Sequence, residues 1–351
     1  MEKYSQFRDK GTAIAPFLPV PPPPVGIVWQ PIYAFLFLCR IPFVIGLSIL
    51  YFGIVEWLPV GGTVKYLVLW ALLGVTGVWW VDFQIDGVKR GQISAAKDHL
   101  PKAGTIIASS FTSPLDPLYL AGIFQPIFTR SYPNSRKVER ITLFRAILLA
   151  FAPPSIIPQD ESKLVTLADL IESNPSSSIC VFPECTTTNG RGILPLSPSL
   201  LSAKGDTKIY PVNLRYTPQD VTTPVSGGYI SWLYQLLSKP SHQMRVRIAT
   251  RVYNSASIDS PAKKNEKAIG TGYDHNVFDA PDFRTGANGR LEKETGMGVT
   301  IGGVEGEISA QEQKVLDRVA EDLARLGRVK RVGLDIGDKI DFLKVWLKRR
   351  R

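Results

Sequence analysis

Two short segments of the sequence combine a carboxylate with several hydroxyl groups, which is the side-chain chemistry that proton transfer and polar-substrate binding need. The first segment reads S-S-F-T-S-P-L-D and ends at Asp116, and the second reads V-F-P-E-C-T-T-T-N-G-R-G and carries Glu184. A carboxylate can orient or accept a proton, and hydroxyl groups can donate or accept hydrogen bonds. We therefore take these two segments as the candidate site.

Each segment follows an apolar run that is typical of a buried strand, at 105–109 and 178–182. Two further strands are predicted at 208–214 and 244–252, and two helices at 115–121 and 162–173. Strands that alternate with helices indicate an α/β domain with a mixed, largely parallel sheet. In such a domain ligands bind at the carboxyl ends of the strands, which is where both segments lie.

Two apolar segments precede this domain, at 32–55 and 67–81, and the connection between them is rich in turn-forming residues. Their uninterrupted apolar runs are shorter than the about 20 residues that a straight membrane span needs. We expect a membrane-embedded helical hairpin, either as two short spans or seated in one leaflet. Two buried core helices of a soluble domain are the alternative, but the apolar character is continuous rather than periodic.

The chain is basic, with a formal net charge of +10, which suits either a nucleic acid or an anionic membrane surface. We favour the membrane over nucleic acid because no zinc-ligand spacing or RNA-binding motif accompanies the charge. Lysines and arginines flank the hairpin on both outer sides, which predicts that the following domain faces the cytosol. The three cysteines are widely spaced, so we expect neither a disulfide nor a metal site.

Composition divides the chain into five predicted regions. The last of them begins with a capping box at Ser309–Glu312 and ends in a segment, 336–347, with apolar residues at helical spacing beside Lys339. That last helix fits either an anionic membrane surface or an ordinary protein surface. The regions are a polar and proline-rich segment (1–31), the membrane hairpin (32–85), the α/β domain (88–255), a flexible insert rich in Gly, Lys and Asn (256–307), and C-terminal helices with a basic tail (308–351).

The two polar segments, together with L-F-R-A at 143–146, resemble conserved blocks of the lysophosphatidic acid acyltransferase (PlsC-like) family of glycerolipid acyltransferases. That family carries N-H-x-x-x-x-D in its first block and F-P-E-G-T in its third. The resemblance covers roughly residues 30–250. It implies a PlsC-like acyltransferase domain behind a membrane hairpin. It also implies transfer of a fatty acyl group from acyl-CoA, in particular oleoyl-CoA, to a lysophospholipid such as lysophosphatidic acid, without a cofactor.

The resemblance also implies roles for individual residues. Asp116 aligns with the aspartate that orients the family's catalytic histidine, and Ser110 aligns with the asparagine of that block; these two are the expected catalytic residues. Thr187 stands where the family's third block has an arginine, and Arg191 is expected to supply that charge. The residues expected to bind substrate are Arg145, Glu184, Thr186 and Arg191.

Phe111 occupies the position of the family's histidine, and this leaves two readings open. The chain is either an acyltransferase that works without that base or a catalytically impaired protein that binds lipid or acyl-CoA, or scaffolds partners. The histidines of the chain are His99, His242 and His275, and a substitute role for His99 is disfavoured because it precedes the strand. A nucleophilic role for Cys185 is disfavoured too, because the family forms no acyl-enzyme.

The resemblance and the charge pattern together predict a location. We expect the chain at the endoplasmic reticulum membrane with its α/β domain in the cytosol, and at lipid droplets as a second site. The expected partners are membrane lipids, acyl-CoA and a lysophospholipid.

Overall fold

A computed structural model describes residues 2–58, 61–88, 99–255 and 308–348. The insert predicted at 256–307, with His275, lies outside the described residues. The same holds for the basic residues Lys89, Arg90 and Lys97 and for the last three residues of the basic tail.

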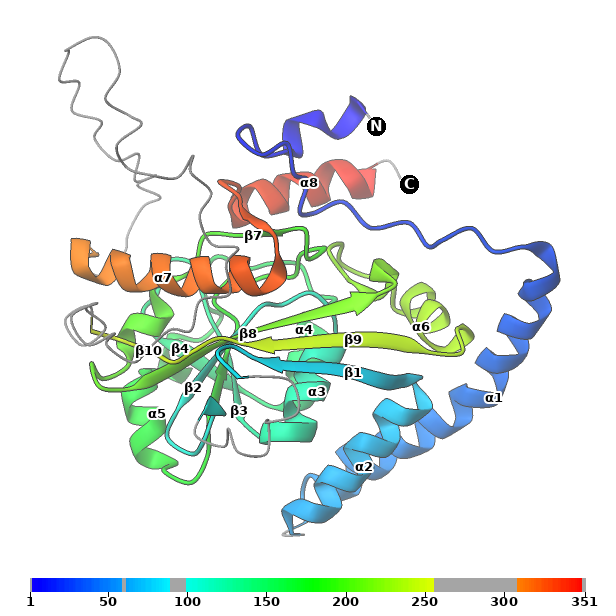
Figure 1. Cartoon of the computed structure of the whole chain (residues 1–351), viewed down its shortest axis with the longest axis horizontal. Helices are drawn as coiled ribbons and strands as arrows, with labels where there is room; N and C mark the ends of the chain where they lie inside the picture. Colours follow the sequence, from blue (N-terminus) through cyan, green and yellow to red (C-terminus); the bar gives the residue numbers. More distant parts are fainter. Residues whose placement is uncertain (1, 59–60, 89–98, 256–307, 349–351) are drawn as a thin grey trace.

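A nine-stranded mixed sheet forms the centre of the molecule, in the order β1-β9-β8-β2-β6-β3-β4-β5, with β10 paired to β8 (Figure 1). The four central strands β8, β2, β6 and β3 run parallel, whereas β8–β9, β3–β4 and β4–β5 pair antiparallel. This confirms the predicted α/β class with a mixed sheet. The strands are β1 (Val78–Ile85), β2 (Ile106–Ser109), β3 (Ile127–Arg130), β4 (Val138–Ile141), β5 (Leu164–Val165), β6 (Ile179–Val181), β8 (Lys208–Thr217), β9 (His242–Ile248) and β10 (Val252–Tyr253), and a separate pair is formed by β7 (Gly192–Ile193) and β11 (Lys330–Arg331).

Helices cover both faces of the sheet. Alternate residues of β2 point to opposite faces: Ile107 joins a core with α2, α3 and α4, and Ile106 joins a core with α5 and α7. The predicted capping box opens α7, because Ser309 Oγ accepts from the Glu312 N–H and the Glu312 side chain accepts from the Ser309 N–H. The helices are α1 (Gln30–Ile49), α2 (Gly62–Val75), α3 (Leu115–Phe124), α4 (Leu143–Leu149), α5 (Leu167–Ser173), α6 (Tyr229–Ser238), α7 (Ala310–Gly327) and α8 (Ile336–Lys348).

The N-terminal hairpin consists of α1, extended by a π-helical turn at Leu50–Val55, and of α2. Its second helix ends before the predicted apolar segment does, because α2 spans Gly62–Val75 and the chain then continues as β1, which pairs with β9. The sequence V-D-F-Q-I in β1 alternates between apolar and polar residues, which is the period of a strand. The tryptophans before it had made this stretch look like the end of the apolar run.

The hairpin is docked on the α/β domain along one side. Leu69, Leu72 and Leu73 of α2 are buried in the core, and Arg40 in the middle of α1 donates hydrogen bonds to the carbonyl oxygens of Leu237 (3.3 Å) and Pro240 (2.8 Å) at the end of α6. Its other side is exposed. The helix at Ile27–Val55 is long and apolar enough to cross a membrane, and only 6% of its most apolar window is buried.

The last helix, α8, is present as predicted, but its apolar face does not face outward. Ile336, Phe342 and Leu343 are buried, and Phe342 contacts the rings of Phe7 and Phe17 from the N-terminal segment. The two ends of the chain therefore lie side by side (Figure 1). The membrane-surface reading of this helix is wrong for its apolar face, which the N-terminal segment covers.

Candidate active site

The sheet brings the two polar segments together, because β2 and β6 are parallel neighbours and each segment leaves the carboxyl end of one of them. The rings of Phe111 and Phe182 are stacked, with 4.4 Å between their centroids and an angle of 25° between their planes. The N–H of Thr188 donates to the carbonyl oxygen of Phe111 (3.0 Å). The two segments thus contact each other directly where the central strands β2 and β6 end at their carboxyl termini.

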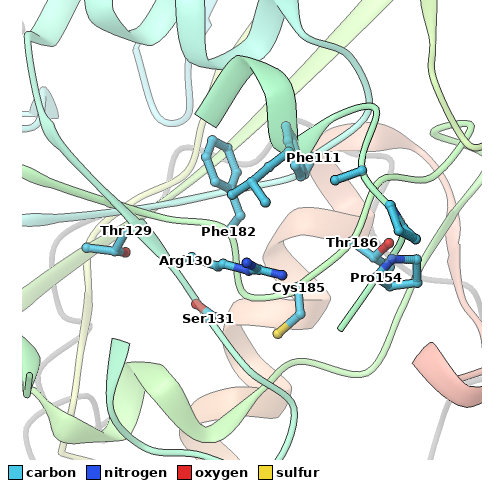
Figure 2. Close-up of a pocket in the computed structure, with 11 residues that line it drawn as sticks. Phe111, Thr129, Arg130, Ser131, Pro154, Phe182, Cys185 and Thr186 are labelled. Carbon is cyan, nitrogen blue, oxygen red and sulfur yellow. The ribbon is translucent and has the colours of Figure 1, made fainter. Parts of the chain in front are cut away.

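A pocket opens beside this unit, between the ends of β2, β3 and β6 and the segment that follows α4 (Figure 2). Phe111 and Phe182 form part of an apolar wall, and Arg130 at the end of β3 points toward Cys185 and Thr186 across the space. The pocket therefore has an apolar side and a side that carries an arginine. The apolar lining is Phe111, Leu149, Ala152, Pro153, Pro154 and Phe182, and the polar lining is Thr129, Arg130, Ser131, Cys185 and Thr186.

Asp116 lies buried at the start of α3, and its oxygens are fully engaged. Oδ2 accepts hydrogen bonds from the N–H groups of Thr112 (2.6 Å) and Ser113 (3.0 Å) and from Thr112 Oγ1 (3.1 Å), while Oδ1 accepts from the Tyr216 hydroxyl. Burial raises the pKa of Asp116 to about 6, against the lowering effect of these hydrogen bonds. Asp116 therefore fixes the turn after Phe111 and is outside the lining of the pocket.

Glu184 is buried at the end of β6 with only 1% of its surface exposed. Its Oε2 accepts from the N–H of Leu194 (3.1 Å), and its Oε1 has no hydrogen-bonding partner among the described residues. Burial raises the pKa of Glu184 to about 8, although the N–H groups of Leu194 and Phe111 and the charge of Lys339 lower it. At neutral pH this carboxyl is mainly protonated and can donate a hydrogen bond.

Cys185 adopts a left-handed backbone conformation, with φ of 56°. This explains the glycine at the matching position of F-P-E-G-T, since glycine adopts that conformation without strain. Burial raises the pKa of the Cys185 thiol to about 12, so the thiolate is scarce at neutral pH. The side chain lines the pocket as a neutral thiol.

Thr186 lines the pocket, and a buried lysine from α8 holds it. Lys339 Nζ donates to Thr186 Oγ1 (2.7 Å), to the carbonyl oxygen of Thr187 (2.6 Å) and to Thr187 Oγ1 (3.1 Å). Burial lowers the pKa of Lys339 to about 7, while the nearby Glu184 raises it. The basic residues around Lys339 favour a surface position, and the structure instead buries it. Its spacing of three residues from both Ile336 and Phe342 is the sequence signal that it shares their buried face.

The other residues expected in the site lie outside the pocket lining. Arg145 is partly exposed and pairs with Glu139 (2.9 Å), and Arg191 is exposed, with its N–H donating to Asn189 Oδ1 (3.1 Å). Ser110 is buried, and its Oγ accepts from Asn213 Nδ2 (3.3 Å). The cation that lines the pocket is Arg130, which sequence reasoning missed because nothing in its strand pattern marks it.

The histidines and the acidic residues give no other centre within the part of the chain that the structure describes. His242 is buried with Nε2 2.8 Å from the carbonyl oxygen of Leu236, and His99 lies outside the pocket lining. Among residues 2–58, 61–88, 99–255 and 308–348, no cluster of three or more His, Cys, Asp or Glu side chains could hold a metal ion.

Two curated fungal proteins are similar to this chain, although no protein-family model matches it. A Schizosaccharomyces pombe protein, provisionally named as a lysophosphatidic acid:oleoyl-CoA acyltransferase, is 26% identical over 256 residues, covering 71% of this chain and 84% of that protein. The Saccharomyces cerevisiae lysophosphatidic acid:oleoyl-CoA acyltransferase 1 is 27% identical over 203 residues, covering 56% of this chain and 61% of that protein.

Proposed function

Because this chain belongs to the PlsC-like glycerolipid acyltransferases, as its two fungal homologues support, we propose that it is a membrane-bound O-acyltransferase. The proposed donor is acyl-CoA, with oleoyl-CoA preferred, and the proposed acceptor is lysophosphatidic acid. The hydroxyl oxygen of the acceptor attacks the thioester carbon, the carbon–sulfur bond breaks, and the proton passes to the leaving thiolate. The products are phosphatidic acid and CoA.

The pocket at the ends of β2 and β6 is the observation that carries this proposal. Its apolar wall, which includes Phe111 and Phe182, offers a contact surface for a fatty acyl chain, and Arg130 offers a cation for a phosphate. The free volume is about 20 Å³, so substrate binding requires the pocket to widen. The guanidinium group of an arginine binds phosphate through paired hydrogen bonds, because its planar donors match the phosphate oxygens. Arg130 also lies over the ring of Tyr132, with 5.1 Å between the guanidinium carbon and the ring centroid, which helps to orient it.

The residues of the site are better suited to holding the two substrates in place than to accepting the proton of the acceptor hydroxyl. Phe111 cannot accept a proton, and both oxygens of Asp116 are occupied by donors. Losing a general base costs about 10²- to 10⁴-fold in rate, whereas holding the reactants in place retains a large part of the acceleration. We therefore expect slow transfer, driven by the orientation of acceptor and thioester within the pocket.

A second candidate function is binding of lipid or acyl-CoA without transfer. The stacking of Phe111 on Phe182 favours it, because this aromatic pair fills the position of the family's base and extends the apolar wall of the pocket. Such a protein would carry or present lipid at the membrane.

For the membrane, we propose that the hairpin sits in one leaflet. The middle of α1 is attached to the domain, since Arg40 binds the carbonyl oxygens at the end of α6. If α1 crossed a bilayer, this end of α6 would lie at the depth of the hydrocarbon core, where polar backbone groups are costly.

The exposed apolar surface continues from the hairpin onto the α/β domain. Phe52 contacts Phe144 of α4 (5.2 Å between ring centroids), and Phe37 contacts Tyr234 of α6 (5.3 Å). Phe144 and Tyr234 remain more than one third exposed. A one-leaflet seat suits both the endoplasmic reticulum, with the domain in the cytosol, and a lipid droplet, whose coat is a monolayer.

The proposal is tested by acyl transfer from labelled oleoyl-CoA with the full chain in lipid nanodiscs. Arg130→Gln should lower transfer to lysophosphatidic acid by about tenfold or more, and transfer to a phosphate-free monoacylglycerol by much less. Arg140→Gln is the matched control, because Arg140 is an exposed arginine outside the pocket lining. Absence of product from every acceptor, in a preparation that binds acyl-CoA, would favour the second candidate.

A further inference from the structure

The loop that follows Glu184 is held by both ends of the chain. On one side, the side-chain amide of Asn189 donates to the carbonyl oxygens of Ala15 (2.8 Å) and Leu18 (2.9 Å). On the other side, Lys339 of α8 binds Thr186 and Thr187. The two ends also contact each other through Phe342 and the N-terminal phenylalanines, so segments far apart in sequence meet at the loop.

Lys339 brings a buried amino group to the loop. Its side chain is 1% exposed, and the three hydrogen bonds from Nζ use the three donors that an ammonium group has. A buried ammonium group that lacked such partners would be strongly unfavourable. The acceptors are all in the loop that lines the pocket, so the loop and the lysine fix each other.

Lys339 reaches the position at which this chain lacks a basic residue of the family's third block. The third block of the family continues with an arginine, and this chain has Thr187 at that position. Lys339 Nζ lies 2.6 Å from the carbonyl oxygen of Thr187, so an amino group that is positively charged when protonated is present there, and it comes from α8. Its three acceptors favour the protonated form. Arg191, which was expected to supply it, is exposed and outside the pocket lining.

We infer that Lys339 is a positioning residue of the site, which supplies from the C-terminal helix the positive charge that the family carries within its third block. It holds Thr186 and, through the loop backbone, Cys185 against the pocket without contacting substrate. Its effect on catalysis rests on the proposed acyl transfer, whereas its effect on the order of the loop does not.

The electrostatics of the buried carboxyl support this inference. The charge of Lys339 lowers the pKa of Glu184, and Glu184 raises the pKa of Lys339, so the two groups lie close enough to affect each other. Glu184 Oε2 in turn binds the N–H of Leu194, beyond the far end of the same loop. Lys339 and Glu184 therefore both contact the chain between Thr186 and Leu194.

The test replaces Lys339 by methionine, which keeps the length of the side chain and removes its charge. Lys344→Met is the matched control, because Lys344 lies on the same helix but is exposed and pairs with Asp341 (2.8 Å). We expect Lys339→Met to speed backbone hydrogen exchange in a peptide spanning 185–194. It should also lower kcat about 10- to 100-fold, with KM for oleoyl-CoA and lysophosphatidic acid changed by less than about threefold.

Lys339→Arg separates the charge from simple packing. If the charge matters, Lys339→Arg keeps more activity than Lys339→Met, although arginine is the larger side chain. Should Lys339→Met not fold, Thr186→Val removes one acceptor of the same network and should shift loop exchange and kcat in the same directions.

Two results would overturn the inference: the same kcat and loop exchange for Lys339→Met and Lys344→Met, or equal losses in Lys339→Met and Lys339→Arg that track their loss of thermal stability. Failure of the unsubstituted protein to acylate any lysophospholipid would instead defeat the proposed function. In that case loop exchange in Lys339→Met against Lys344→Met still decides the structural part.

Discussion

The two polar segments of the site differ in where their support comes from. In the first, Asp116 binds the backbone of Thr112 and Ser113 within its own turn and accepts one further hydrogen bond from Tyr216 of β8. The second depends on distant parts of the chain, since Lys339 and the backbone near Ala15 hold the loop after Glu184. The carboxylate of the first segment thus keeps most of its hydrogen bonds within its own motif, whereas the loop of the second segment takes a donor from α8.

The largest effect is expected where the turn around Asp116 is broken. Asp116→Ala leaves the Tyr216 hydroxyl and two backbone N–H groups buried without their acceptor, so we expect a loss of about 3 kcal/mol in the free energy of unfolding. Asp341→Ala, which removes an exposed carboxylate, should cost about 0.5 kcal/mol or less. Chemical denaturation of both variants measures the difference, and equal losses would contradict the role given to Asp116.

A pH dependence tests the buried carboxyl of the second segment. The pKa of Glu184 is raised to about 8, so the stability that its proton confers is fully present below the ordinary pKa near 4.5 and is lost as the pH rises through 8. Between pH 5 and 7 this contributes a fall of about 1 kcal/mol per pH unit. Unfolding measured at several pH values should show a flatter profile for Glu184→Gln than for the unsubstituted protein.

Asp116 also contributes to the pH dependence of stability, in both the unsubstituted protein and Glu184→Gln. Its pKa is raised to about 6, so its contribution is also lost with rising pH, but mainly between about 4 and 6. Glu184→Gln should keep this lower part of the profile and lose the part between pH 6 and 7. An unchanged slope in that upper part would mean that Glu184 is not the titrating group.

A smaller effect is expected where the loop approaches the C-terminal region. A Cβ at Gly192 would lie 2.8 Å from Val332 Cγ1, so Gly192→Ala should destabilise the protein by about 1–2 kcal/mol. Gly205→Ala is the control, because its Cβ would meet ordinary contact at 3.7 Å from Ser255. Thermal unfolding that ranks the two variants the other way would contradict the packing of β7 against β11.

The smallest effect concerns the backbone of the loop itself. Cys185 has φ of 56°, and glycine adopts that conformation without a steric penalty, so Cys185→Gly should stabilise the protein by up to about 1 kcal/mol. Glycine also gains freedom in the unfolded chain, which offsets part of this. A loss of more than about 1 kcal/mol on thermal unfolding would mean that the thiol contributes packing beyond what its backbone costs.

The sequence predicted those parts of the fold whose signals are local. The strands before the two polar segments and the capping box at Ser309 follow from residues that are neighbours in the chain. The boundary between α2 and β1 was missed, because Trp79 and Trp80 continue the apolar run and hide the alternation that follows.

In the site, the order of the strands brings the two polar segments together as their positions after β2 and β6 suggest. Arg130 and Lys339 could not be found that way. Arg130 reaches the pocket only because β3 is the neighbour of β6, and Lys339 only because α8 packs over the loop. Periodicity marks Lys339 as buried, but the approach of both side chains to the pocket depends on tertiary pairing, which periodicity does not encode.

The most direct test of the account is the rate of phosphatidic acid formation by the unsubstituted protein and by Phe111→His in nanodiscs that contain lysophosphatidic acid and labelled oleoyl-CoA. The account predicts slow formation by the unsubstituted protein and an increase of about tenfold or more in Phe111→His, because a histidine returns a base to an otherwise assembled site. A Phe111→His variant that binds acyl-CoA but forms no product would contradict it and leave a lipid-binding protein.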